Sequence, residues 1–233
     1  MNLKFIFTVL LSLTVFSVNT SAQDSKFSTQ AKTEIQECEK GDASICYEVG
    51  VRYDNGDGVP QDYEKSAFYY KKGCDGDDYS ACYNLAISYD EGEGVEKDHV
   101  KAVSYYKKAC DGGDVDACYN LGVSYDQGEG VEVDYVKGAF YYTKGCDAGD
   151  PDSCHNLAIS YDDGEGVKQD KQKAVELYRK ACEGESMDSC YNLADSYEEG
   201  EGVAKDIDKA IELFTRVCVS GDNEGCQRVR SLQ

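Results

Sequence analysis

Apolar residues recur along the chain at the spacing of an amphipathic α-helix. In residues 81–90, Cys82, Leu85, Ala86 and Tyr89 stand at positions i, i+3, i+4 and i+7, so they share one helix face. The same face returns 36 residues later and again in further copies. A fixed period of this length is typical of a solenoid, in which each unit packs on its neighbours.

A second helix is predicted in each unit, after a glycine-rich turn. In the copy just described, the first helix stops before Gly92 and Gly94, and Asp98 stands where the next helix needs an N-cap. Residues 100–110 then resume the helical pattern. We expect basic residues near the ends of these second helices to complement the dipole of their own helix. They are Lys72, Lys108, Lys144, Lys180 and Arg216.

The pattern therefore predicts an all-α protein, an αα-hairpin solenoid with two helices per unit, which we name A and B. Helix A begins near the second cysteine of each pair, and helix B ends at the first cysteine of the next pair. The predicted full units are residues 43–78, 79–114, 115–150, 151–186 and 187–222, with capping helices over 23–42 and 223–233. Atypical, polar end units are what a solenoid needs to stay soluble.

All 12 cysteines fall into pairs separated by seven residues, one pair per unit. The pairs are Cys38 and Cys46, Cys74 and Cys82, Cys110 and Cys118, Cys146 and Cys154, Cys182 and Cys190, and Cys218 and Cys226. Zinc sites are the alternative, but they usually pair cysteines two to four residues apart with further ligands nearby. We therefore expect one disulfide per repeat, joining the end of helix B to the start of the next helix A.

Residues 1–22 resemble a secretory signal peptide. One lysine precedes an apolar run, which ends in small residues before a plausible cut after Ala22. The run is too short for a membrane-spanning helix, so no membrane anchor is expected. Export would place the cysteines in an oxidising compartment, which agrees with disulfides. The predicted location is secreted or periplasmic.

The acidic composition restricts the partners. A net charge of −21 repels phosphate backbones, so we expect no binding to nucleic acid. A cationic partner is compatible with this charge, and so is an acidic surface that only keeps the protein soluble. We expect no cofactor and no metal site, since His99 and His155 are the only histidines and lie far apart in the sequence.

The repeated motif resembles the Sel1-like repeat. Each unit carries Tyr-x-x-Gly-x-Gly-Val, then aspartate, then a helix with an aromatic or aliphatic pair, although the tryptophan usual in helix B is absent. The paired cysteines narrow the resemblance to the secreted Helicobacter cysteine-rich protein family. This resemblance implies a solenoid of the tetratricopeptide type that binds proteins or peptides. It also implies penicillin binding with weak β-lactamase activity, so a β-lactam or a peptidoglycan-derived peptide is a possible ligand.

The residues themselves indicate no catalytic site. Ser104 and Lys107 match the Ser-x-x-Lys motif of serine β-lactamases, but the Ser-Asp-Asn and Lys-Thr-Gly motifs that accompany it are missing. The repeats also place other residue types at the position of Ser104. Two distant histidines do not supply the metal ligands of a metallo-β-lactamase.

A binding surface is predicted on the A helices, on the face opposite the core. Asparagine and serine recur there four residues apart, and in tetratricopeptide-like stacking helix A lines the concave side. Amide side chains at these positions can hydrogen-bond an extended peptide backbone. Exposed polar positions that are simply copied with the repeat are the alternative. The predicted ligand-binding residues are Asn84, Ser88, Asn120, Ser124, Asn156, Ser160, Asn192 and Ser196.

Overall fold

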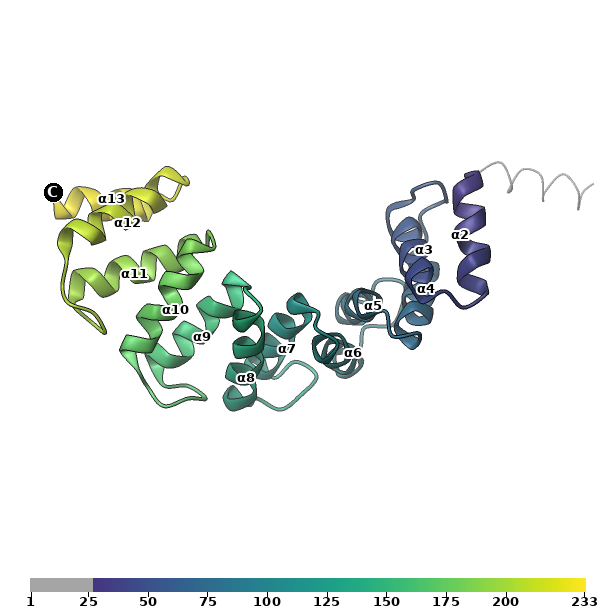
Figure 1. The fold of residues 1–233 in the computed structure, drawn as a ribbon, viewed down its shortest axis with the longest axis horizontal. Helices are drawn as coiled ribbons and strands as arrows, with labels where there is room; N and C mark the ends of the chain where they lie inside the picture. Colours follow the sequence, from purple (N-terminus) through teal and green to yellow (C-terminus); the bar gives the residue numbers. More distant parts are fainter. Residues whose placement is uncertain (1–26) are drawn as a thin grey trace, which may run out of the picture. The chain divides into compact units, whose positions relative to one another are not determined.

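The structure is a computed structural model that describes residues 27–233, and all the regular secondary structure of these residues is α-helical (Figure 1). This confirms the all-α solenoid prediction. The predicted signal peptide, residues 1–22, lies outside the described residues. The helices are α2 (Thr29–Glu39), α3 (Ala43–Asn55), α4 (Tyr63–Asp75), α5 (Tyr79–Glu91), α6 (His99–Asp111), α7 (Val115–Gln127), α8 (Tyr135–Asp147), α9 (Pro151–Asp163), α10 (Lys171–Glu183), α11 (Met187–Glu199), α12 (Ile207–Val219) and α13 (Asn223–Leu232).

The chain forms two compact units that divide after Asp98. The first contains α2 to α5 and the second α6 to α13, and within each unit every helix packs on the next helix in the chain. The A helices are α3, α5, α7, α9, α11 and α13, and the B helices are the even-numbered ones. No helix within residues 27–233 combines the length and the apolar composition that crossing a bilayer requires.

The predicted N-caps are confirmed for α4, α8, α10 and α12, and the predicted glycine C-caps for the A helices α3, α5, α7, α9 and α11. The side chains of Asp134 and Asp170 accept hydrogen bonds from the backbone N–H groups of Lys137 and Lys173, so they cap the N-termini of α8 and α10. Asp62 and Asp206 cap α4 and α12 in the same way. The first glycine of each turn ends the A helix in the left-handed conformation, which costs glycine little because it has no side chain. These glycines are Gly56, Gly92, Gly128, Gly164 and Gly200.

The second glycine of the turn permits close backbone contact between neighbouring repeats. Gly166, after α9, has φ of +72°, and a Cβ atom there would overlap the backbone of Tyr135 at the start of α8. Gly130 stands in the same relation to His99. The turn after each A helix therefore rests on the first turn of the preceding B helix, with no room for a side chain.

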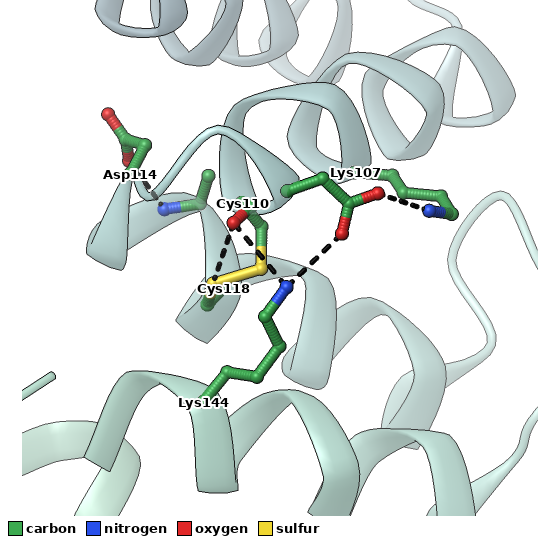
Figure 2. The surroundings of a disulfide bond; sticks show 7 residues. Lys107, Cys110, Asp114, Cys118 and Lys144 are labelled. Carbon is green, nitrogen blue, oxygen red and sulfur yellow. Dashed lines mark hydrogen bonds and ion pairs between the residues drawn. A yellow bond between two sulfur atoms is a disulfide. The ribbon is translucent and has the colours of Figure 1, made fainter. Parts of the chain in front are cut away.

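The structure contains six disulfides, and they pair the cysteines as predicted. Each joins the end of a B helix to the first turn of the next A helix, with Cα atoms 4.5–4.7 Å apart. Figure 2 shows one of them, Cys110–Cys118, with the Asp114 side chain accepting from the backbone N–H of Ala117 at 2.9 Å. Disulfides persist in oxidising spaces, so this set fits an extracytoplasmic environment.

The basic residues near the ends of the B helices lie in the last turn of their own helix, as expected, and they also have a second role. Lys144 Nζ reaches the preceding B helix, where it lies 3.5 Å from the Cys110 carbonyl oxygen and 3.1 Å from Asp111 Oδ1 (Figure 2). Arg216 donates in the same way to the carbonyl oxygen of Cys182, at 2.9 Å. These cations therefore bind free carbonyl oxygens at the carboxyl end of the B helix one repeat earlier, and so link successive B helices.

Candidate binding surface on the A helices

The asparagines and serines predicted to bind a ligand differ in the exposure of their side chains. Asn84, Asn120, Asn156 and Asn192 are partly exposed on α5, α7, α9 and α11. The serines Ser88, Ser124 and Ser160 are buried, each only 8–9% exposed, and Ser196 is intermediate. All four serine hydroxyls donate, at 2.9–3.0 Å, to the carbonyl oxygen four residues earlier in their own helix.

The expectation that these serines lie on an exposed face is therefore wrong for Ser88, Ser124 and Ser160. Their hydroxyls already donate a hydrogen bond to a backbone carbonyl of the same helix. Serine can make this bond without leaving the helical conformation. Ligand binding remains a prediction for the asparagines, which are partly exposed.

A cavity of about 280 Å³ lies on the second unit, between α7, α8 and α9. Its polar lining includes Asp126 at the end of α7, Tyr142 on α8, and Asn156 on α9. Glu165, in the turn after α9, closes one side, and Tyr135 at the start of α8 also contributes. We call this the Asp126 cavity.

The same cavity recurs one repeat later, between α9, α10 and α11. Its volume is about 350 Å³, and Asp162, Tyr178, Asn192 and Glu201 stand 36 residues after their counterparts in the Asp126 cavity. We call it the Asp162 cavity. Asn156 and Asn192 therefore each line a cavity that also contains an acidic residue and an aromatic ring.

Asp126 is the half-buried acidic group of the Asp126 cavity. Its Oδ2 accepts a hydrogen bond from the Tyr142 hydroxyl at 3.0 Å. Burial raises the pKa of Asp126, the Tyr142 hydrogen bond opposes this rise, and the charge of Glu165 adds to it. Gly138 on α8 makes room for the carboxylate, since a Cβ at this position would overlap Asp126 Oδ1. At this position α4 carries serine, α6, α10 and α12 carry alanine, and α2 carries glutamine.

Cations from the chain itself occupy the equivalent acidic positions further along. Lys171, the counterpart of Tyr135, lies 2.9 Å from Asp162 Oδ1 and 3.1 Å from Glu201 Oε2. No cation among the residues that the structure describes is bonded to Asp126 or Glu165. The Asp126 cavity thus differs from the Asp162 cavity in that a tyrosine, Tyr135, stands at the position of Lys171.

One repeat further, Arg228 on α13 takes the position of the asparagine. Its guanidinium pairs with Glu198 and Asp195, at 2.6 Å from Asp195 Oδ1, and lies 4.8 Å from the centre of the Phe214 ring. Glu198 and Phe214 are the counterparts of Asp126 and Tyr142. A guanidinium therefore occupies this acidic and aromatic position in the last copy.

Ser104 has no catalytic surroundings. It is exposed on α6, and its hydroxyl donates to the carbonyl oxygen of Lys101 in the same helix, at 2.7 Å. Lys107, the second residue of the Ser-x-x-Lys match, pairs with Asp111 (Figure 2). The lysine that would have to activate the serine is therefore engaged elsewhere, and nothing here favours β-lactam hydrolysis.

Comparisons with known proteins agree with the repeat architecture. The family model described as the Sel1 repeat matches residues 43–78, 80–114, 115–150, 151–186 and 188–218. A search of curated proteins gives no match.

Several solved structures are similar to this chain. A protective antigen of uropathogenic Escherichia coli strains that displays an SLR fold is 32% identical over 84% of this chain, with a TM-score of 0.82, and the chain spans 42% of its length. A Sel1 repeat protein from Oxalobacter formigenes is 28% identical over 79% of this chain and 76% of its own, with a TM-score of 0.72. Cysteine rich protein B of Helicobacter pylori is 33% identical over 56% of this chain and 94% of its own, with a TM-score of 0.46.

Proposed function

Because the chain belongs to the Sel1 repeat family, we propose that it is a disulfide-stapled scaffold that binds an extended peptide or protein segment along its A helices. The family acts in protein–protein interaction, and this supports the class of function. We also propose that the protein works outside the cytoplasm, as a secreted or periplasmic protein. The six disulfides and the signal-like residues 1–22 support that location.

The observation that carries the proposal is the repeated cavity. Asn156 and Asn192 occupy the same place in two hollows one repeat apart, each beside a buried tyrosine. An asparagine amide both donates and accepts, so it can hold a peptide group without selecting the side chain attached to it. Sites repeated along a solenoid suit an extended ligand, since one segment can pass from unit to unit.

Selection of binding peptides tests this proposal. Random dodecapeptides displayed on phage are selected on the oxidised protein, and the selected peptides are measured by calorimetry. We expect a variant with Asn156→Ala and Asn192→Ala to bind about 10- to 30-fold more weakly, since each amide contributes about 1 kcal/mol.

The matched control carries Thr143→Ala and Thr215→Ala, two exposed positions on the B helices. Its affinity should equal that of the unchanged protein. Failure to select any peptide, or an equal loss in both variants, would rule out the A helices as the binding surface.

A further inference from the structure

The Asp126 cavity combines three features that together determine which side chain fits it. The cavity is open to solvent and has a volume of about 280 Å³. It contains a half-buried carboxylate, Asp126, with one oxygen held by the Tyr142 hydroxyl. It also carries a second carboxylate, Glu165, on its rim. Two acidic groups that share a confined space repel each other unless a cation lies between them.

The last copy shows what satisfies the Asp126 position, although its second carboxylate, Asp195, stands where Val123 lines the Asp126 cavity. There the Arg228 guanidinium reaches the two carboxylates Glu198 and Asp195 while lying over the Phe214 ring. Arginine suits such a position because its planar group donates to two carboxylate oxygens and stacks on an aromatic face. In this copy, the acidic position equivalent to Asp126 therefore binds a guanidinium supplied by the chain itself.

In the Asp126 copy, no residue of the described part of the chain, 27–233, supplies such a cation. The position of Arg228 is taken by Asn156, which is too short to fill the hollow, and the position of Lys171 is taken by Tyr135. Gly138 leaves room for the carboxylate of Asp126 beside α8, since a Cβ at this position would overlap Asp126 Oδ1. The Asp126 cavity therefore keeps its two carboxylates without an internal cation among residues 27–233.

We propose that the Asp126 cavity binds an arginine side chain of the partner segment, with Asp126 and Glu165 as its acidic ligands, while the hydroxyl of the buried Tyr142 holds Asp126 in place. The proposal rests on the proposed function, because the arginine belongs to the segment that lies along the A helices. It identifies the partner as a cationic segment, which also agrees with the net charge of −21.

The test uses two labelled dodecapeptides of alanine, glycine and serine with one central residue changed. The central residue is arginine in the first peptide and citrulline in the second, which has nearly the same shape without the charge. Fluorescence anisotropy at low and physiological salt measures both. We expect the arginine peptide to bind at least about tenfold more tightly than the citrulline peptide, since charge-assisted hydrogen bonds are the stronger class.

Variants of the oxidised full chain locate the effect. Asp126→Asn should lower the affinity for the arginine peptide about tenfold and leave the citrulline peptide unchanged, and Gly138→Ala should weaken binding by displacing Asp126. The matched control, Glu176→Gln, removes one exposed acidic group on α10 and should change the affinity less than twofold. Circular dichroism confirms that each variant is folded.

The outcomes separate this inference from the proposed function. If the two peptides bind equally well and both weaken with Asn156→Ala, the A helices bind peptides but arginine binding in the Asp126 cavity is refuted. If Glu176→Gln weakens binding as much as Asp126→Asn, the attraction is general and arginine binding in the Asp126 cavity is again refuted. If the arginine peptide does not bind, while peptides selected from the random library do, arginine binding in the Asp126 cavity is refuted and peptide binding by the A helices stands. If no peptide of either source binds, both arginine binding in the Asp126 cavity and peptide binding along the A helices are refuted.

Discussion

Removing one disulfide measures how far covalent links hold the repeats together. The change is Cys110→Ala with Cys118→Ala, which deletes the bridge between α6 and α7 shown in Figure 2. Both side chains are buried, at 2% and 4% exposed, so alanine keeps the site apolar and removes only the sulfur atoms.

The expected cost follows from the length of chain that the bridge closes. The two cysteines are eight positions apart, and the chain-entropy relation for a loop of about nine residues gives about 2.6 kcal/mol at 25 °C. For a protein of this size, 1 kcal/mol corresponds to a shift of about 2–4 °C in Tm. We therefore expect the melting temperature to fall by about 5–10 °C.

The assay is thermal unfolding followed by far-ultraviolet circular dichroism, without reductant, on variant and unchanged protein. Mass spectrometry verifies that the other five disulfides are intact. A fall of less than about 1 °C would refute the reasoning. It would mean that the Asp114 cap and the Lys144 link to Cys110 already hold this corner closed in the absence of the bridge.

Three further predictions concern the turns, the links between units and pH. Gly166→Ala should lower the free energy of unfolding by about 1–3 kcal/mol in urea titration, and by more than Gly149→Ala, because both have positive φ but only Gly166 lies against backbone. Lys144→Met should cost about 1 kcal/mol by losing its bond to the Cys110 carbonyl, and an unchanged urea midpoint would contradict this. Affinity for the arginine peptide should fall as pH is lowered, because protonation removes the charge of Asp126. Burial raises the pKa of Asp126, so the loss begins at higher pH than for an ordinary aspartate, and Asp126→Asn should abolish this part of the pH profile.

The sequence was enough to predict the architecture because the repeat presents each local signal several times. The helical spacing around Leu85, the N-cap at Asp134 and the turn glycine Gly164 are local features, and each recurs at the same place in successive units. The disulfide pairing followed in the same way, since Cys110 and Cys118 stand at the two ends of one short loop. The family match then agreed with the repeat pattern.

The binding surface was predicted only in part, because its key contacts join residues from different helices. The proximity of Asp126 and Tyr142 depends on how α7 packs on α8, and nothing in the spacing of the sequence shows that Gly138 makes room for it. Ser160 was misjudged since its place on the helix does not reveal that its hydroxyl bonds the carbonyl of Asn156. The second role of Lys144 was not predicted because its partner lies one repeat earlier.

The most direct test of the binding surface is a nuclear magnetic resonance titration with the arginine dodecapeptide. It follows the side-chain amide signals of the oxidised protein. The signals of Asn156 and Asn192 should shift in a saturable way, and Asp126→Asn should suppress the shift at Asn156. Shifts confined to amides of the B helices, such as that of Gln172, would place the ligand on another surface and contradict the role assigned to the A helices.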